Sequence, residues 1–309
     1  MINILFAAQP EQFPLYNQYL QTHLKAAGLK ANLVMECPPN VVDYIIYAPN
    51  SSIQDLSQFT RCKAVLNLWA GVETITGNKT LNQPLCRMVD SGLQKGMTEW
   101  VAGHVLRYHL GMDKHIVNPE RIWHDAHPPL AKDRPVTILG LGALGAASAR
   151  MLDHLGFPVT GWSRTPKNIT NILCLHGDDS LSLALQEAEI LVLLLPDTPQ
   201  TLNIINSDTL AQMPNGCVII NPGRGSLIDD EALLDALLTG HVASACLDVF
   251  RTEPLPKEDA YWEMPNVTVT GHVASSTRAD SASRVIVQNI ARGEANLPFL
   301  YLVDRQAGY

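Results

Sequence analysis

The feature that most constrains this chain is a glycine-rich turn, GLGALG, at residues 140–145. It follows a short aliphatic run at 136–139 that is typical of a buried parallel strand, and apolar residues at helical spacing follow it from 146 to 155. Gly140 permits a tight turn, Gly142 lets the backbone approach a pyrophosphate, and Gly145 lets the helix pack close to the strand. The helix N-terminus offers unpaired N–H groups and a partial positive charge to phosphates. The stretch therefore predicts a dinucleotide-binding unit. We expect five of its residues to contact the coenzyme, namely Gly140, Gly142, Ala143, Leu144 and Gly145.

The end of this unit indicates which dinucleotide binds. A second strand is expected at 159–162, and Ser163, Arg164 and Thr165 follow it. An acid at this point would bind the ribose diol of NAD and repel a 2′-phosphate. Arg164 can instead pair with a phosphate through two hydrogen bonds and lie flat on the adenine, although a solvated arginine in a polar loop is the alternative. We therefore predict NADP(H) as the coenzyme, with these three residues in contact with it.

Composition limits the class of protein. A chain of 309 residues favours about two domains. Its 22 Lys and Arg against 30 Asp and Glu give a formal charge of -8, which argues against nucleic acid or an anionic membrane as a partner. Its longest apolar run, at 190–195, is stopped by Pro196 and is too short to span a bilayer.

The remaining compositional signals concern the compartment. The first ten residues carry no charged side chain, so the basic leader of a secretory peptide is missing. Six cysteines lie far apart with no CxxC pair, which supports neither a disulfide framework nor a metal site. We expect a cytoplasmic protein without a bound metal.

Strand-like runs alternate with helical stretches along the chain, which predicts parallel sheets and an α/β fold. The expected strands are INILFA, ANLVM, YIIYA, AVLNL and CRMV in the first ninety residues, and then 136–139, 159–162, 190–195, 217–221, 243–249 and 267–270. The expected helices include 11–27, 179–189 and 229–238. No glycine-rich loop follows an early strand, so the first part of the chain reads as a smaller domain without a nucleotide.

Two long helices suggest how the domains connect. A helix is expected at 97–111, with Thr98 as its cap and a hinge near Gly96. The last helix, at 279–292, is long enough to return to the first domain. We therefore expect residues 1–96 with 279–309 to form one domain, and residues 97–278 to form the dinucleotide-binding domain.

Ligands in open α/β sheets collect at the carboxyl ends of the strands. The loop Ala70-Gly71-Val72 ends one early strand, and its amides could hold a substrate carboxylate; an ordinary β-to-α turn is the alternative. Leu195 and Pro196 end the strand at 190–195 and are candidate coenzyme contacts.

Three polar residues close strands in the dinucleotide half, namely Arg224, Glu253 and His272. Singly, they could be a surface arginine, a solvated glutamate and a buried histidine. Together they suit the reduction of a 2-oxo acid, because a histidine can protonate the carbonyl oxygen, a carboxylate can orient its ring, and a guanidinium can grip the substrate. Nicotinamide supplies the hydride. Asp248 could accept a hydrogen bond from the nicotinamide carboxamide, or could equally cap its strand.

The motifs GLGALG, NPGRGSLIDDEAL, LDVFRTEPLP and GHVASST cover the dinucleotide half in order. With them the chain resembles the D-isomer-specific 2-hydroxyacid dehydrogenases. NLWAGVET, MTEW and GWSRT make it most similar to their glyoxylate/hydroxypyruvate reductase A branch. The resemblance implies two Rossmann-like or flavodoxin-like domains with a cleft between them, NADPH as coenzyme and a homodimer. It also implies that Arg224, Glu253 and His272 are catalytic, that residues 70–72 hold the carboxylate, and that Trp69 walls a small pocket.

We therefore predict NADPH-dependent reduction of glyoxylate and hydroxypyruvate to glycolate and D-glycerate. One alternative is a reductase for a bulkier 2-oxo acid. Another is a dinucleotide-sensing binding protein of the same fold without turnover. The segment at 121–129 is neither clearly strand nor helix, and reads equally as an arm against a second subunit or as a surface loop.

Overall fold

The computed structural model describes residues 1–305 and 308. The chain forms two compact units. Unit 1 contains Met1–Leu93 and the described residues from Ser276 onward, and unit 2 contains Gln94–Ser275. Helix α3 (Ser91–His109) contains the first boundary between them.

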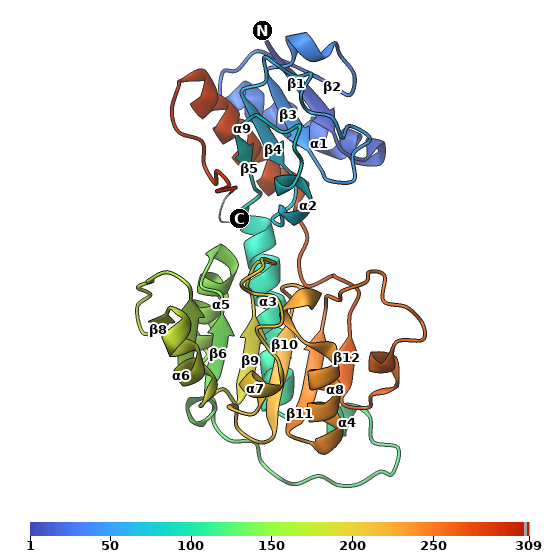
Figure 1. The fold of residues 1–309 in the computed structure, drawn as a ribbon, viewed down its shortest axis with the longest axis vertical. Helices are drawn as coiled ribbons and strands as arrows, with labels where there is room; N and C mark the ends of the chain where they lie inside the picture. The colour runs from blue at the N-terminus through green and yellow to red at the C-terminus, as the bar shows by residue number, and fades with distance from the viewer. Residues whose placement is uncertain (306–307, 309) are drawn as a thin grey trace. The chain divides into compact units, whose positions relative to one another are not determined.

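Unit 1 is built on a five-stranded parallel sheet in the order β2-β1-β3-β4-β5 (Figure 1). This is the flavodoxin-like strand order. The strands are β1 (Ile2–Ala7), β2 (Ala31–Val34), β3 (Tyr44–Tyr47), β4 (Ala64–Asn67) and β5 (Leu85–Cys86). The helices of the unit are α1 (Phe13–Ala26), α2 (Glu73–Thr76) and α9 (Ala279–Glu294).

The sheet of unit 1 is buried on both faces. Side chains alternate along each strand, so Ile4 and Phe6 of β1 pack with α1 and α9. Leu5 and Ala7 point the other way, into a core completed by the segments between β3 and β5. This two-sided burial explains why the strands read as continuous apolar runs.

Unit 2 is built on a seven-stranded parallel sheet in the order β12-β11-β10-β9-β6-β7-β8. Counted within the unit, the order is 3-2-1-4-5-6 with one further strand, as in dinucleotide-binding folds. The strands are β6 (Val136–Leu139), β7 (Val159–Ser163), β8 (Leu173–His176), β9 (Ile190–Leu193), β10 (Cys217–Asn221), β11 (Val242–Leu247) and β12 (Val267–Val269). The helices, besides α3, are α4 (Asp113–Ile116), α5 (Ala143–His154), α6 (Leu181–Leu185), α7 (Ser207–Leu210) and α8 (Asp230–Thr239). The predicted α/β class with parallel sheets is confirmed.

Helices cover both faces of this sheet. Val101 and Val105 of α3 are fully buried with Ile138 of β6 on one face. Leu139, the next residue of β6, points to the opposite face and packs in a core with Leu233 of α8. The switch of side from one residue to the next is the alternation expected of a strand.

One strand was missed and two local predictions were wrong. Strand β8 was not anticipated, because it lies at the sheet edge and its residues alternate poorly, with Leu173 58% exposed. The helix expected at 179–189 is only the short α6. Thr98 is not a cap, because α3 begins at Ser91; the Thr98 hydroxyl donates to the Gln94 carbonyl, and Asp90 accepts hydrogen bonds from the first-turn amides.

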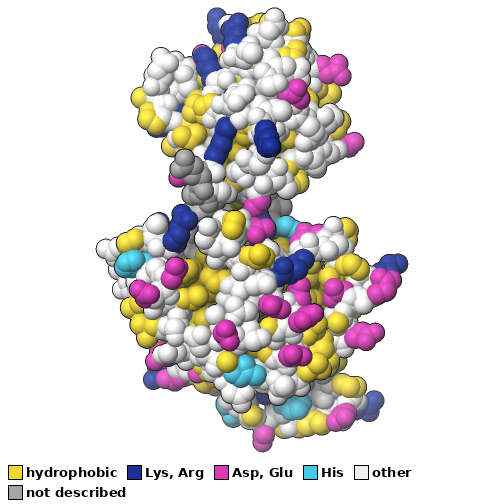
Figure 2. Space-filling model, viewed as in Figure 1, with side chains coloured by type: hydrophobic (Ala, Val, Ile, Leu, Met, Phe, Trp, Pro, Cys, Tyr) yellow, Lys and Arg dark blue, Asp and Glu magenta, His cyan; other side chains and the backbone are white. Residues whose placement is uncertain are grey.

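Within the described residues, none of the helices has both the length and the apolar character needed to cross a bilayer. On the face drawn in Figure 2, Lys and Arg side chains lie scattered and do not gather into one basic patch. This distribution agrees with the net negative charge of the chain.

Candidate active site

The glycine turn between β6 and α5 uses each of its three glycines differently. Gly140 has φ +107°, and a Cβ there would lie 2.4 Å from the Leu194 carbonyl oxygen. A Cβ on Gly145 would lie 1.8 Å from the Gly140 carbonyl oxygen, so the helix approaches the turn only with glycine at this position. Gly142 is exposed, and a Cβ there would meet no atom within 4 Å. Two glycines therefore shape the turn, and the third leaves open space at the start of α5.

The N-terminus of α5 is free to interact with an anion. Its N-cap is Gly142, which has no side chain to accept a hydrogen bond, and its first turn carries no acid. Ala143 and Leu144, which begin the helix, are half-buried. A helix of 12 residues has a partial positive charge at this end, and here no carboxylate of the helix neutralises it.

The end of β7 presents a hydroxyl and a cation rather than a carboxylate. Ser163 is buried, and its hydroxyl donates to the Thr165 carbonyl at 2.9 Å, which folds the turn. Arg164 and Thr165 are exposed beyond the strand. Ser163 therefore shapes the turn that projects the other two residues.

The loop after β9 is held rigid by its own hydroxyl groups. Leu195 is buried and Pro196 is half-buried. The preceding residue, Leu194, packs closely against the turn at Gly140. The Thr201 hydroxyl donates to the Pro196 carbonyl at 2.7 Å. This loop thus forms a fixed wall beside the glycine turn.

Arg224 lies in a loop organised by a residue that sequence reasoning missed. Asn221, the last residue of β10, is 1% exposed; its amide donates to the Arg224 carbonyl at 2.9 Å and accepts from the Gly223 N–H at 3.0 Å. A Cβ on Gly225 would lie 2.1 Å from the Phe250 carbonyl carbon, so the loop packs tightly against the segment after β11. Arg224 is half-buried, and its Nη1 donates to the Gly223 carbonyl at 2.7 Å. An asparagine before Pro-Gly at a strand end is typical of such a turn, and was the available signal.

Asp248 holds the loop that carries His272. Its side chain is fully buried and accepts hydrogen bonds from the Thr270 hydroxyl at 2.5 Å and from the N–H groups of Val273 and Ala274, both at 2.9 Å. Its backbone carbonyl accepts from the His272 N–H at 2.7 Å. These hydrogen bonds fit the role of holding the chain at the end of its strand, and the contact of Asp248 with the coenzyme stays a prediction.

Glu253 and His272 form a direct pair. The Nδ1 atom of His272 lies 2.7 Å from Oε2 of Glu253, and the side chains are 50% and 35% exposed. The other carboxylate oxygen accepts from the Phe250 N–H at 2.9 Å, so the glutamate is itself oriented. His272 has φ +55°, an unusual conformation for a residue other than glycine. With Nδ1 engaged by the carboxylate, Nε2 is the ring atom left to face a ligand.

The three predicted catalytic residues lie at the carboxyl-terminal end of one sheet. Arg224 follows β10, Glu253 follows β11 and His272 follows β12, and these strands are neighbours in the sheet. The strands are parallel, so their carboxyl ends lie at the same edge, where ligands of α/β folds bind.

The loop at 70–72 lies in unit 1, and Leu68 and Trp69 connect it to the end of β4. Trp69 is 42% exposed, Ala70 and Gly71 are half-buried, and Val72 is buried at the start of α2. Asn67 ends the strand and is 1% exposed. The loop thus has the position expected of a ligand-binding loop in this sheet.

The clustering of possible metal ligands and the ionisation of the buried thiols are further features of the structure. Among residues 1–305 and 308, no three His, Cys, Asp or Glu side chains converge as a metal site. Burial raises the pKa of the Cys62, Cys86 and Cys246 thiols to about 12, and that of Cys217 to about 11. These thiols are therefore protonated at neutral pH and are not nucleophiles.

Comparisons with known proteins identify the family of the chain. The model of the D-isomer specific 2-hydroxyacid dehydrogenase NAD binding domain matches residues 105–274, more than half of the chain. The glyoxylate/hydroxypyruvate reductase A of Yersinia enterocolitica is 35% identical over 299 residues, which cover 94% of each chain. That of Klebsiella pneumoniae is 33% identical over the full length of both chains.

Solved structures give the same result. A D-isomer specific 2-hydroxyacid dehydrogenase from Xanthobacter autotrophicus, in complex with NADPH and MES, superposes with a TM-score of 0.93 at 36% identity and covers 99% of each chain. An NADPH-dependent glyoxylate/hydroxypyruvate reductase from Sinorhizobium meliloti, in complex with NADP and sulfate, has a TM-score of 0.84 at 32% identity, covering 100% of this chain and 99% of that one. The glycine turn, the Glu253–His272 pair and these relationships show that the chain is an oxidoreductase of the D-isomer specific 2-hydroxyacid dehydrogenase family.

Proposed function

We propose that this chain reduces glyoxylate and hydroxypyruvate to glycolate and D-glycerate with NADPH. The observation that carries the proposal is the 2.7 Å contact between Glu253 and His272, on the same sheet edge as Arg224. The relatives that bear this activity in their names support the choice of substrates.

The residues of unit 2 fit a phosphorylated dinucleotide. The open space at Gly142 and the acid-free start of α5 suit the pyrophosphate. Arg164 beyond β7 suits the 2′-phosphate, in a position where a carboxylate would repel it. When bound, the reduced nicotinamide supplies the hydride. Two structural relatives contain NADPH or NADP, which supports the assignment.

His272 delivers the proton to the carbonyl oxygen of the substrate. Its Nδ1 contacts Glu253, so Nε2 is the atom that donates. Glu253 keeps the imidazole ring of His272 in one orientation. Its carboxylate also stabilises the positive charge that the ring carries before it gives up the proton. The buried carboxylate of Asp248 keeps the whole loop in place.

Arg224 and residues 70–72 bind the substrate. The guanidinium of Arg224 pairs with the carboxylate and the carbonyl oxygen, and it stabilises the negative charge that develops on that oxygen. The amides at 70–72 hold the carboxylate, and Trp69 restricts the size of the side chain that fits. A 2-oxo acid carries the carboxylate and the carbonyl oxygen that these groups are proposed to bind.

Steady-state kinetics test this proposal directly. Glyoxylate, hydroxypyruvate, pyruvate and phenylpyruvate are each supplied with NADPH and with NADH. We expect the highest kcat/KM for glyoxylate or hydroxypyruvate with NADPH. A preference for phenylpyruvate or for NADH would contradict the substrate or the coenzyme assignment, respectively.

We further propose that the protein is a homodimer, with the segment at 116–130 as part of the interface. This segment exposes several large apolar side chains: Ile116 (72%), Val117 (73%), Trp123 (90%) and Leu130 (66%). Covering such side chains with a second copy would remove them from water. Sedimentation equilibrium is expected to show a dimer that Trp123→Ala weakens; a monomeric wild-type protein would contradict the proposal.

All six cysteines are free thiols in the structure. We infer a reducing compartment such as the cytoplasm, where thiols stay reduced. Fractionation of the source cells tests this inference.

A further inference from the structure

A buried asparagine organises the loop that follows β4. The Nδ2 atom of Asn67 donates to the Trp69 carbonyl at 2.8 Å and to the Gly71 carbonyl at 3.1 Å. Both partners are acceptors, so the amide must present its NH₂ group to them. The Trp69 carbonyl also accepts from the Met88 N–H at 3.0 Å, so Asn67 shares this carbonyl with the segment after β5 and holds the Gly71 carbonyl as well.

This arrangement decides where the loop amides point. In a trans peptide the C=O and the following N–H point in opposite directions. With the Trp69 and Gly71 carbonyls turned toward Asn67, the N–H groups of Ala70 and Val72 point away from it. No hydrogen bond from these two N–H groups is found within the described residues. Asn67, with the Met88 N–H at the first carbonyl, therefore leaves two donors directed outward, which suits an anion such as a carboxylate.

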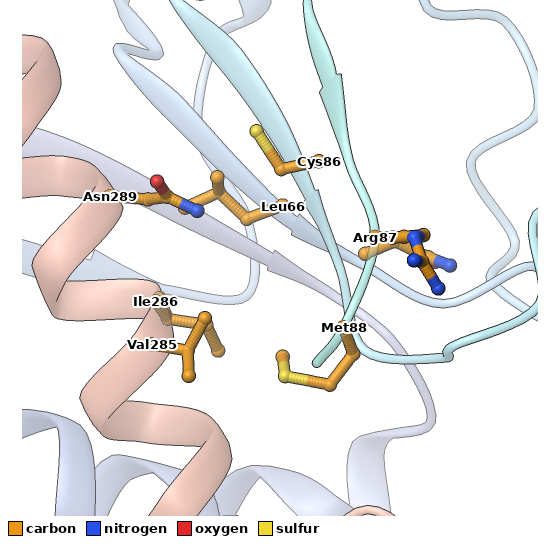
Figure 3. A pocket seen from close by; sticks show the side chains of 8 residues that line it. Leu66, Cys86, Arg87, Met88, Val285, Ile286 and Asn289 are labelled. Atoms are coloured by element: carbon orange, nitrogen blue, oxygen red, sulfur yellow. The ribbon is translucent and has the colours of Figure 1, made fainter. Parts of the chain in front are cut away.

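The oxygen of the same amide destabilises the fold, because it is buried without a hydrogen-bond partner among the described residues. Asn67 Oδ1 is buried and has no hydrogen-bond partner within residues 1–305 and 308. Asn67 also lines a narrow cavity, where Leu66 and Met88 face Val285 and Ile286 of α9 (Figure 3), and this cavity has no room for a water molecule. A leucine of similar size would avoid the unpaired oxygen. The NH₂ group, acting on the loop, is what accounts for an amide at this position.

We propose that Asn67 is a positioning residue for the substrate carboxylate, acting through the N–H groups of Ala70 and Val72. The inference rests on the proposed function in that it takes this loop as the carboxylate site. Asn67 itself does not touch the substrate. Its removal weakens the binding of carboxylates and leaves the binding of coenzyme unchanged.

The test compares Asn67→Leu with a matched control in the same unit, Gln83→Met. Gln83 is also buried, and its Nε2 also donates to two loop carbonyls, those of Leu56 at 3.1 Å and Phe59 at 3.0 Å. Both substitutions thus remove a buried amide of the same kind. Asn67→Ser retains one donor and serves as the second variant if the leucine variant does not fold.

Oxalate is titrated calorimetrically into the full-length protein saturated with NADP⁺, and the Kd for NADPH and the Tm are measured alongside. We expect Asn67→Leu to weaken oxalate binding at least tenfold and Asn67→Ser to weaken it less. Gln83→Met should stay within about twofold of wild type, although both amide losses lower the Tm. The NADPH Kd should stay within about twofold in every variant.

Three outcomes would overturn the inference: unchanged oxalate binding in both Asn67 variants, an equal loss in Gln83→Met, or no oxalate binding by the wild-type protein. Glyoxylate turnover by the wild type is scored separately. A wild type that binds oxalate but does not reduce glyoxylate would refute the proposed function. The oxalate affinities of the Asn67 and Gln83 variants would still test the role of Asn67.

Discussion

The role of Asp248 can be tested with Asp248→Asn, which preserves the shape of the side chain. The carboxylate now accepts from the Thr270 hydroxyl and the Val273 N–H on one oxygen and from the Ala274 N–H on the other. An asparagine would place its NH₂ group against the Ala274 N–H and leave a buried donor unpaired, at a cost of about 1–3 kcal/mol. The two remaining hydrogen bonds would lose their charge-assisted strength, about 1 kcal/mol each. The total is roughly 3–5 kcal/mol.

This free energy is lost from the state in which the loop holds His272 beside Glu253. A loss of about 3–5 kcal/mol in that state corresponds to a rate lower by roughly a hundredfold to a few thousandfold. We therefore expect kcat with glyoxylate to fall about that far. The Kd for NADPH, measured by fluorescence titration, should change by less than about threefold. Thr270→Val serves as the control, since it removes one donor of three; a cost of about 1 kcal/mol predicts less than a tenfold decrease.

The opposite pattern would refute this reasoning. If Asp248 contacted the nicotinamide carboxamide directly, Asp248→Asn would weaken NADPH binding strongly. Wild-type kcat in Asp248→Asn would equally exclude a role in holding the loop. A crystal structure of the variant would show whether residues 270–274 have moved.

Three further predictions follow from the site and its surroundings. Arg164→Ala should reduce the preference for NADPH over NADH by about 1–3 kcal/mol, measured as the ratio of kcat/KM values; an unchanged ratio would remove Arg164 from coenzyme selection. His272→Ala should nearly abolish turnover with the NADPH Kd largely intact, and substantial remaining activity would exclude His272 as the proton donor. Burial, with the nearby Arg107, lowers the pKa of His104 below its ordinary 6.5. The unfolded chain therefore binds the proton more readily than the folded one, so the free energy of unfolding should fall as the pH drops from 7 toward 5. Urea titrations should show a shallower decline in His104→Leu, and an identical slope would contradict the burial argument.

Much of the fold was predictable because it depends on local patterns. The strand–turn–helix at 136–155 needs only the glycine spacing and the apolar periodicity, and all five strands of unit 1 are marked by apolar runs. Strand β8 was not predictable in the same way. It lies at a sheet edge, where one side lacks a neighbouring strand and burial imposes little pattern on its side chains.

The candidate site was likewise predictable only in part. The types of Arg224, Glu253 and His272, and their places after strands, were readable from the residues alone. That Glu253 and His272 come within 2.7 Å depends on β11 and β12 being neighbours, which the residues between them do not specify.

The sequence by itself determined the α/β class, the position of the dinucleotide turn and the chemical character of the site, since each depends on residues close together along the chain. Only the tertiary structure decided what Asn67, Asn221 and Asp248 do. Each of these side chains is buried at the end of a strand and hydrogen-bonds the backbone of a functional loop. Asp248 reaches a loop about two dozen residues away, which lies beside it only because parallel strands bring their carboxyl ends to one edge of the sheet. For Asn67 and Asn221 the partners are near in sequence, but which amide atom meets which carbonyl depends on how the surrounding core buries the side chain.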